Sequence, residues 1–505
     1  MRHTLNLPDE RPLSGRLINA DLAPTDGARR TWSTWNICAL WIGMSVCVTT
    51  YTLAADLVLD AGLSVAEALV VIGLGNLIIL VPMILNAHPG TKYGIPFPVL
   101  ARASFGTLGA NIPAMMRAFV ACGWFGIQTW IGGKALYQLH LVAFPGGLGL
   151  PNILPDWVGL NTEQAIAVLL FWLINVYFIL KGTESIKWLE TLSAPLLIGV
   201  GLALLVWAYD RAGGFGAMFG RASKLDSTEK WMTTFFPVLT GMVGYWSTVA
   251  LNIPDFSRFA RGQREQAWGQ ALGLPATMVL YSFIGVAVTS VSEQIYGKAL
   301  RDPIDVVAQI GGTGVVLLSM VALSVATLTT NIAANVVSPA NDISNLAPHR
   351  ISYKAGGMIT AIAGLAFFPW KVYESHRVYI ETWLIGYAML LAPITAILIV
   401  DYFLLRKREL NVDDLYREDG EYRYTRGFNL VAIAALVIGI APNLPGFLNK
   451  VMHIGEAPAA PTLWDHIYNL SWFVGFAVGG AAYLALSVLF RTIRKPDLAE
   501  EAEEP

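Results

Sequence analysis

The chain has 505 residues, of which 55% are hydrophobic and 14% are charged, and its mean hydropathy is +0.53. A soluble domain carries about 25% charged residues, so too few polar side chains remain here to cover such a core in water, and lipid must solvate much of the surface. The formal net charge of −2, without any basic block, gives no reason to expect a nucleic-acid partner.

The chain opens with a polar segment, residues 1–34, that contains Arg11, Arg16, Arg29 and Arg30. It shows no cleavable signal, so the first apolar span is expected to serve as an uncleaved membrane signal. A spanning helix needs about 20 mainly apolar residues. Twelve stretches meet this requirement, and long intervals without Asp, Glu, Lys or Arg coincide with several of them. The predicted spans are roughly 35–58, 63–87, 111–137, 163–180, 191–209, 231–252, 267–291, 314–338, 355–372, 380–404, 427–447 and 467–490.

Lys and Arg in the loops predict the orientation of these spans. If the N-terminus lies inside, most of the Lys and Arg residues in the loops lie on the inner side of the membrane, as the positive-inside rule requires. An even number of spans then places both the segment 1–34 and the acidic tail 492–505 in the cytoplasm. We therefore expect a multi-pass protein of the inner (plasma) membrane, whose transmembrane domain covers residues 35–491 and whose tail is disordered.

Two connecting segments stand out. Residues 88–102, which begin His88-Pro-Gly-Thr-Lys-Tyr-Gly, are rich in helix breakers and are predicted to form a loop on the inner side. Residues 405–426 are the most charged linker and are predicted to be an ordinary solvated loop. The cysteines Cys38, Cys47 and Cys122 all fall in apolar stretches, where we expect them to be small buried hydrophobic residues.

The first and sixth spans contain glycines and hydroxyl side chains where a regular helix would be expected. The first reads Trp41-Ile-Gly-Met-Ser-Val-Cys-Val-Thr-Thr-Tyr51, and the sixth reads Thr240-Gly-Met-Val-Gly-Tyr-Trp246. Both are predicted to unwind at mid-depth, and interrupted spans at corresponding places in two halves point to a transporter binding site. Helix packing through small residues is the alternative for either segment alone.

The third span carries Trp124 and Gln128, which are four residues apart and so share one helix face. An indole beside a carboxamide suits a flat heterocycle, because the ring can stack while the amide pairs with a ring N–H and C=O. The alternative is an interfacial tryptophan with a helix–helix hydrogen bond.

The eighth span carries two further amides, Asn331 and Asn335, again four residues apart, with Thr329 and Thr330 just before them. Such polar groups are costly against lipid, so they are expected to face the protein interior or a cavity. Hydroxyl and carbonyl oxygens suit a hard monovalent cation. The alternative is that the threonines bond to their own helix backbone.

Taken together, these residues resemble the nucleobase:cation symporter family, which includes hydantoin, allantoin, uracil and cytosine permeases. The resemblance extends over nearly the whole chain. It begins at Asn19-Ala-Asp-Leu-Ala-Pro24, and its most specific segments are His88-Pro-Gly-Thr-Lys-Tyr-Gly, Trp124-Phe-Gly-Ile-Gln128, Asn252-Ile-Pro-Asp-Phe-Ser-Arg-Phe259 and Asn331-Ile-Ala-Ala-Asn-Val-Val-Ser-Pro339.

The resemblance implies an all-α, LeuT-type five-plus-five inverted repeat, with repeat one at about 35–210, repeat two at about 231–404 and two extra helices at about 427–491. It implies a heterocyclic substrate, sodium or a proton as the coupling ion, no other cofactor, and a monomer. The implied substrate-binding residues are Trp124, Gln128, Trp246, Asn331 and Asn335. The implied sodium ligands are the carbonyls of Gly43, Val46 and Ala326 with the hydroxyls of Thr329 and Thr330. Relatives place an amide near the position of Cys47, which we include in the binding site, and a proline is common at the position of Thr49.

Three other classes fit the sequence less well. A membrane-embedded enzyme would need acids, histidines or a nucleophile converging at one depth, and the predicted spans offer none. A channel would not need twelve unlike spans with two interruptions. An amino-acid carrier of the same fold would require charge compensation for a zwitterion.

Overall fold

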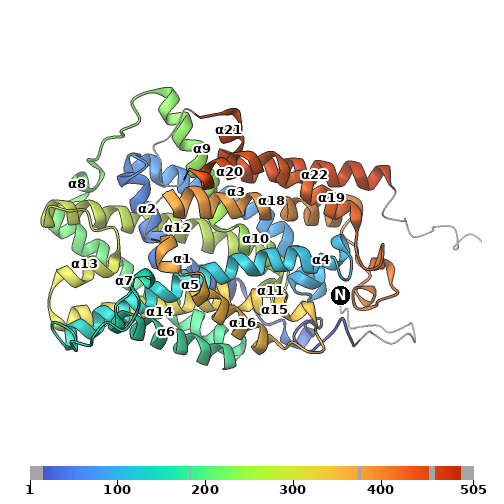
Figure 1. The fold of residues 1–505 in the computed structure, drawn as a ribbon, viewed down its shortest axis with the longest axis horizontal. Coiled ribbons are helices and arrows are strands. Elements are labelled where there is room, and N and C mark those ends of the chain that lie inside the picture. Colours follow the sequence, from blue (N-terminus) through green and yellow to red (C-terminus); the bar gives the residue numbers. More distant parts are fainter. Residues whose placement is uncertain (1–14, 182, 374–376, 454–460, 491–505) are drawn as a thin grey trace, which may run out of the picture.

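The computed structural model describes residues 15–181, 183–373, 377–453 and 461–490. The expected acidic tail 492–505 and the first part of the expected segment 1–34 lie outside these residues. The start of the described chain and the end of α22 lie at the same end of the molecule, on the right of Figure 1. This arrangement agrees with an even number of membrane crossings.

The described chain is almost entirely helical (Figure 1), and each of the twelve predicted spans falls on helix. The first half contains η1 (Gly27–Arg29), α1 (Thr34–Ser45), α2 (Val48–Leu59), α3 (Val65–Tyr93), α4 (Phe97–Phe105), α5 (Asn111–Ala143), η2 (Asp156–Val158), α6 (Thr162–Lys181), α7 (Thr183–Ala212), α8 (Phe215–Phe219), α9 (Thr228–Tyr245), α10 (Ser247–Asn252) and α11 (Pro254–Ser257). The second half contains α12 (Gln263–Tyr296), α13 (Pro303–Ile310), α14 (Thr313–Asn335), α15 (Val337–Leu346), α16 (Tyr353–Ala366), α17 (Pro369–Tyr373), η3 (Arg377–Leu384), α18 (Ile385–Ile399), η4 (Val400–Leu405), η5 (Asp413–Tyr416), η6 (Glu421–Arg423), α19 (Leu430–Ile440), η7 (Ala441–Asn443), α20 (Leu444–Met452), α21 (Leu463–Asn469) and α22 (Ser471–Leu489).

Eight of the described helices are long and apolar enough to cross a membrane, and α1 with α2 makes a ninth if this bent pair is one span. The other predicted spans fall on helices that are short, broken or interrupted by charge, such as the 14-residue α16. The helix count is therefore consistent with twelve spans.

Both predicted interruptions are present. Helix α1 ends at Ser45 and α2 begins at Val48, with a bend of 57° between them. Val46 (φ −81°, ψ 78°) and Cys47 (φ −140°, ψ 161°) lie outside helical geometry. The sixth span breaks at Trp246 (φ −103°, ψ 6°), between α9 and α10. Each break removes backbone groups from the helical ladder and makes them available to a ligand.

Helix α12 packs closely against the broken first span because it presents glycines to it. A Cβ at Gly273 would lie 2.7 Å from Trp41 Cβ, and one at Gly285 would lie 2.7 Å from the carbonyl oxygen of Tyr51. Only a residue without a side chain permits this approach. Helix α14 packs against α5 and also contacts α1. The two broken spans thus face α5 and α14 across the centre of the bundle.

The prediction that residues 88–102 form a loop is wrong. Helix α3 continues through Pro89 to Tyr93, ends at Gly94 in the left-handed region (φ 75°), and α4 begins at Phe97. Tertiary packing overrides the local breakers here: Gly90 lies against α11, and the Thr91 hydroxyl donates to the Ser257 carbonyl at 3.0 Å.

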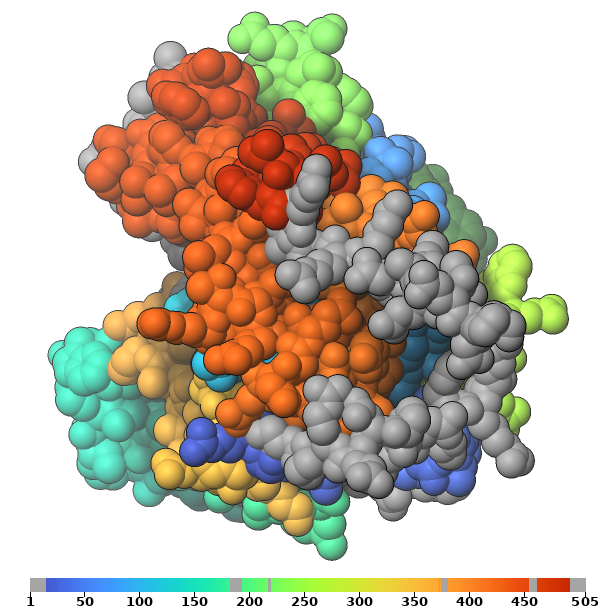
Figure 2. All heavy atoms as spheres, turned by 90° about the vertical axis from the view of Figure 1, so that its right-hand side faces the viewer, coloured from blue at the N-terminus to red at the C-terminus, as the bar shows by residue number. Residues whose placement is uncertain are grey.

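The prediction that residues 405–426 form an ordinary solvated loop is also wrong. Leu415, Tyr416 and Tyr422 are fully buried, and this part of the chain covers the middle of one end of the molecule, shown in orange in Figure 2. Composition misled the prediction because several of its charged side chains are paired within the fold. Of the cysteines, Cys47 and Cys122 are buried, as expected, and Cys38 is half-buried.

Candidate functional site

A small cavity lies beside both breaks, near the centre of the bundle. It is lined by ten residues of the first, third, sixth and eighth spans, none of them charged: Met44, Trp124, Gln128, Tyr245, Trp246, Thr248, Val249, Thr330, Ala334 and Asn335. The structure therefore brings together four of the expected substrate residues, namely Trp124, Gln128, Trp246 and Asn335, and one expected sodium ligand, Thr330. Cys47 and Asn331 are fully buried and do not line the cavity.

The two cavity tryptophans are separated by an aromatic residue that sequence reasoning missed. The Tyr245 ring lies 5.4 Å from the Trp124 ring and 5.0 Å from the Trp246 ring, both in edge-to-face arrangements. Trp41 supports Trp246 from behind, at 5.1 Å and again edge to face. Such aromatic contacts hold ring planes in defined orientations. The only sequence signal for Tyr245 is its place immediately before Trp246, in the interrupted segment.

The Tyr245 hydroxyl ties this aromatic group to the break in the first span. It lies 2.7 Å from Thr49 Oγ1, 3.3 Å from Thr50 Oγ1 and 3.5 Å from Cys47 Sγ. Gln128 Nε2 in turn donates to Thr49 Oγ1 at 3.3 Å. Cys47 thus takes part in the site through this hydroxyl network rather than through the cavity wall.

The two asparagines of α14 have different roles. Asn335 lines the cavity, and its Nδ2 donates to Asn331 Oδ1 at 3.1 Å. Asn331 is held between helices, where its Nδ2 donates to Asn175 Oδ1 of α6 at 3.1 Å. Both amides point into the protein, as expected, and Asn331 supports Asn335 from behind.

The expected cation ligands come from α1, from the break that follows it and from α14. The Thr330 hydroxyl donates to the Gly43 carbonyl at 2.9 Å and joins the two helices. The Thr329 hydroxyl donates to the Ala326 carbonyl of its own helix at 2.8 Å, which is the local bond considered as its alternative role. Val46 lies in the break. Carbonyl and hydroxyl oxygens of this kind form a donor set that suits a hard cation.

A buried arginine lies directly beyond the cavity. Arg117 of α5 is completely buried; its Nη2 donates to the carbonyl of Ala334, a cavity residue, at 2.9 Å, and its Nε donates to Asn252 Oδ1 at 3.0 Å. Two buried carboxylates, Asp255 and Asp342, oppose its charge. Arg117 was not singled out from the sequence, although an ionisable residue within a span is itself a signal of function.

The cavity is small in this conformation. Its volume of about 20 Å³ is near the minimum for one water molecule, whereas a cavity of roughly 150 Å³ accommodates benzene. A flat heterocycle therefore requires the lining side chains to move apart.

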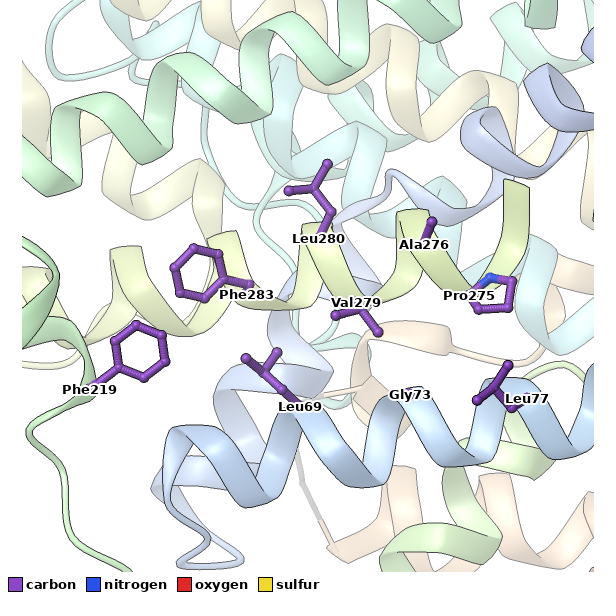
Figure 3. Close-up of a pocket in the computed structure, with 9 residues that line it drawn as sticks. All are labelled: Leu69, Gly73, Leu77, Phe219, Pro275, Ala276, Val279, Leu280 and Phe283. Carbon is purple, nitrogen blue, oxygen red and sulfur yellow. The ribbon is translucent and has the colours of Figure 1, made fainter. Parts of the chain in front are cut away.

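A larger hollow, of about 640 Å³, lies between α3 and α12. Figure 3 shows Phe219 of α8 beside Phe283, and Leu69 and Val279 in the space between the two helices. The Phe219 and Phe283 rings stack with centroids 5.5 Å apart. No lining side chain carries a polar group that could form a hydrogen bond with a heterocycle, so the smaller central cavity is the better candidate site.

Comparison with known proteins decides the family. The sequence model of a protein family, described as permeases for cytosine/purines, uracil, thiamine and allantoin, matches residues 24–475. This chain belongs to that family. It is 44% identical over 502 residues to the purine-uracil permease NCS1 of Arabidopsis thaliana, covering 98% of this chain and 82% of the relative. It is 39% identical over 503 residues to the allantoin permease of Bacillus subtilis, covering 99% and 98%.

A solved structure shows the same fold. Mhp1, a nucleobase-cation-symport-1 family transporter in a closed conformation with bromovinylhydantoin bound, superposes with a TM-score of 0.77 at 24% identity, covering 95% of this chain and 98% of Mhp1. The expected fold class, a LeuT-type inverted repeat with two extra C-terminal helices, is confirmed. The expectation of a transporter rather than an enzyme is also confirmed, because the relatives are permeases.

Proposed function

We propose that this permease is a cation symporter that imports a nucleobase or a related cyclic amide or ureide, such as uracil, allantoin or hydantoin, by alternating access. One observation carries the proposal: Trp124, Gln128, Trp246 and Asn335, from three spans, line one buried, uncharged cavity beside two broken helices. The names of the relatives, a purine-uracil permease and an allantoin permease, support the substrate class.

In this proposal the indoles of Trp124 and Trp246 stack on the two faces of the substrate ring, and the amides of Gln128 and Asn335 pair with its edge. An uncharged lining favours a neutral heterocycle over an amino acid, because a buried zwitterion would need charged partners. Since the cavity is smaller than such a ring, loading requires α5, α9–α10 and α14 to separate. This motion is the local part of alternating access.

The coupling ion is proposed to be sodium, held by the carbonyls of Gly43, Val46 and Ala326 and the hydroxyls of Thr329 and Thr330. A cation there would bind α1 and α14 together next to the substrate, which is the arrangement that symport requires. A proton is the alternative ion.

We also propose the orientation and organisation expected from the sequence. Both termini lie in the cytoplasm, the repeats occupy about 35–210 and 231–404, and the extra helices occupy about 427–491. A single chain lines the whole cavity, so a monomer suffices for transport.

The proposed substrate site is tested by removing an indole that would stack on the ring or an amide that would pair with its edge. Stacking contributes roughly 0.5–1.5 kcal/mol beyond area burial, and an unpaired buried polar group costs about 1–3 kcal/mol. Trp124→Ala and Asn335→Ala should each lower substrate affinity by at least about tenfold. Affinity is measured by binding of radiolabelled uracil and allantoin to purified protein.

The control is Trp268→Ala, because Trp268 of α12 is 55% exposed and faces away from the cavity. It should bind like the wild type. Wild-type affinity in Trp124→Ala or Asn335→Ala would show that the cavity is not the substrate site.

A further inference from the structure

Two consecutive residues of opposite charge, at one end of the molecule, reach two different helices. Arg301 and Asp302, which we call the strap, immediately precede α13, on the left of Figure 1 and opposite the described chain ends. Arg301 Nη1 lies 2.9 Å from Asp56 Oδ1 of α2 and 2.6 Å from Asp60 Oδ2, just after α2. Asp302 Oδ2 lies 2.7 Å from Lys134 Nζ of α5. The strap therefore links α2 to α5.

The strap is held more firmly than a typical surface ion pair. The side chain of Asp302 is 11% exposed and that of Asp56 is 10% exposed, so water and salt screen these charges less than at the surface. Asp302 also caps α13, because its Oδ1 accepts from the Ile304 N–H at 2.9 Å. Lys134 Nζ reaches a second carboxylate in the first turn of α13, Asp305 Oδ2, at 2.9 Å. The strap and α13 are thus attached to α5 as one unit.

Both helices that the strap joins run from the central cavity to this end of the molecule. Gln128 of α5 lines the cavity, and Lys134 follows it by six residues, about 9 Å along the helix axis. Thr49, which bonds to Gln128, lies at the start of α2, and Asp56 follows it by seven residues, about 10 Å. The strap therefore crosses between α2 and α5 about two turns beyond the cavity. In the proposed orientation, this is the outer side.

We propose that the strap holds the outer side of the protein closed, and that the cavity opens to the outside only after the strap detaches from α2 or from α5. The two groups of ion pairs lie in series, one at Arg301 and one at Asp302. Releasing either group therefore frees the two helices from each other. The inference builds on the alternating access of the proposed function, but it does not depend on which molecule the cavity binds.

The test measures how fast a cysteine in the cavity reacts with a membrane-impermeant thiol reagent, added to the outer face of right-side-out membrane vesicles. Thr248→Cys places this thiol at a cavity residue that has no assigned role in substrate or ion binding. Lys134→Met and Arg301→Gln are each added to it. Each should raise the reaction rate by roughly fivefold, because partly buried ion pairs no longer oppose a minor open state.

The combined variant distinguishes a strap from two independent contacts. Because the links lie in series, Lys134→Met together with Arg301→Gln should react no faster than the faster of the single variants. Independent contacts would instead multiply their effects on the rate. Lys134→Arg keeps the charge and should react at the rate of Thr248→Cys alone. Unchanged rates in both single variants, or multiplied rates in the combined variant, would overturn the inference.

Two controls separate opening of the cavity from general loosening of the fold. Arg221→Gln removes an ion pair with Glu293 at the same end of the molecule, 2.8 Å long, which joins the connection after α8 to α12 rather than α2 to α5. It should leave the rate unchanged. Labelling of the buried Cys122, resolved by peptide mass spectrometry, should also stay at its wild-type level in every variant. A parallel rise at Cys122 would show that the fold has loosened and would count against the strap. None of these results requires a substrate, so they leave the binding test of the proposed function independent.

Discussion

At the scale of single residues, Tyr245 is the link between the two broken helices. Its ring contacts Trp124 and Trp246, while its hydroxyl reaches Thr49 in the first span. Gln128 bonds to the same threonine. The position of the Gln128 amide therefore depends on a hydroxyl that belongs to a different helix.

Tyr245→Phe removes this hydroxyl and keeps the ring. A hydrogen bond contributes about 0.5–1.5 kcal/mol net, so substrate affinity should fall by roughly two- to tenfold while the stacking surface is retained. Equilibrium binding to purified protein measures the change. Tyr177→Phe is the matched control, because Tyr177 of α6 is 56% exposed. Identical affinities for the two variants would mean that the hydroxyl network does not support the site.

At the scale of elements, the contact between α1 and α14 connects the proposed ion site to the proposed substrate site. Thr330 lines the cavity and donates to the Gly43 carbonyl just before the break in the first span. Any ion that holds these helices together would also shape the cavity wall. Thermodynamic linkage then requires each ligand to raise the affinity for the other by the same factor.

Substrate affinity should accordingly rise with sodium concentration at fixed pH and ionic strength, with choline as the replacement cation. Thr329→Ala combined with Thr330→Ala should abolish this dependence while the tryptophans still stack. Thr327→Ala is the control, since Thr327 is buried in the same helix and bonds only to its own backbone at Leu323. A flat sodium response in the wild type would instead favour proton-driven or uncoupled uptake.

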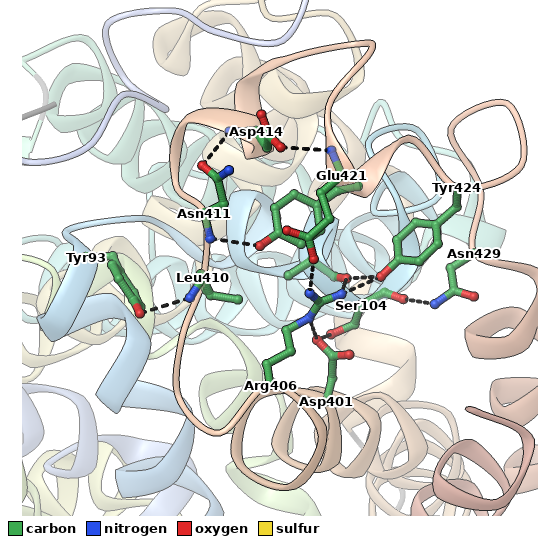
Figure 4. Close-up of polar contacts among 12 residues, drawn as sticks. Tyr93, Ser104, Asp401, Arg406, Leu410, Asn411, Asp414, Glu421, Tyr424 and Asn429 are labelled. Atoms are coloured by element: carbon green, nitrogen blue, oxygen red, sulfur yellow. Dashed lines mark hydrogen bonds and ion pairs between the residues drawn. The ribbon is translucent and has the colours of Figure 1, made fainter. Parts of the chain in front are cut away.

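At the scale of the whole molecule, a buried ionic network ties together distant parts of the chain at the end that carries both described chain ends (Figure 4). Arg406 lies 2.9 Å from Asp401 and 2.6 Å from Glu421 of η6. Asp401 also accepts hydrogen bonds from Ser104 of α4 and Tyr483 of α22, at 3.0 and 2.7 Å. The segment 405–426 is thereby anchored to the helical bundle at several points.

Arg406→Ala would leave Asp401 buried without its counter-charge. Breaking a buried pair in this way costs about 3–5 kcal/mol, so the melting temperature of the purified protein in detergent should drop markedly. Arg423→Ala removes an exposed arginine of the same segment, and it should melt like the wild type. Equal melting temperatures for the two variants would show that the network does not stabilise the fold.

The sequence by itself determined the membrane class, the apolar stretches that form helices, the interruptions in the first and sixth of them, and the family resemblance. These features are local. Composition decides which solvent the surface needs, apolar length decides what can cross a bilayer, and glycines with polar residues inside an apolar stretch indicate where a helix is weak. The spacing of Trp124 and Gln128 likewise predicted that both would share a face, and both line the cavity.

Only the tertiary structure decided which residues of other helices contact each helix face. Asn331 and Asn335 have the same spacing as Trp124 and Gln128, yet Asn335 lines the cavity and Asn331 is held by Asn175, because α6 packs at that level. Residues 88–102 and 405–426 are ordered by partners far away in the chain, and the role of Tyr245 depends on Thr49 almost two hundred residues earlier. Helical periodicity gives a side chain's direction around its own axis, but its partner is set by packing between elements that are distant in the sequence.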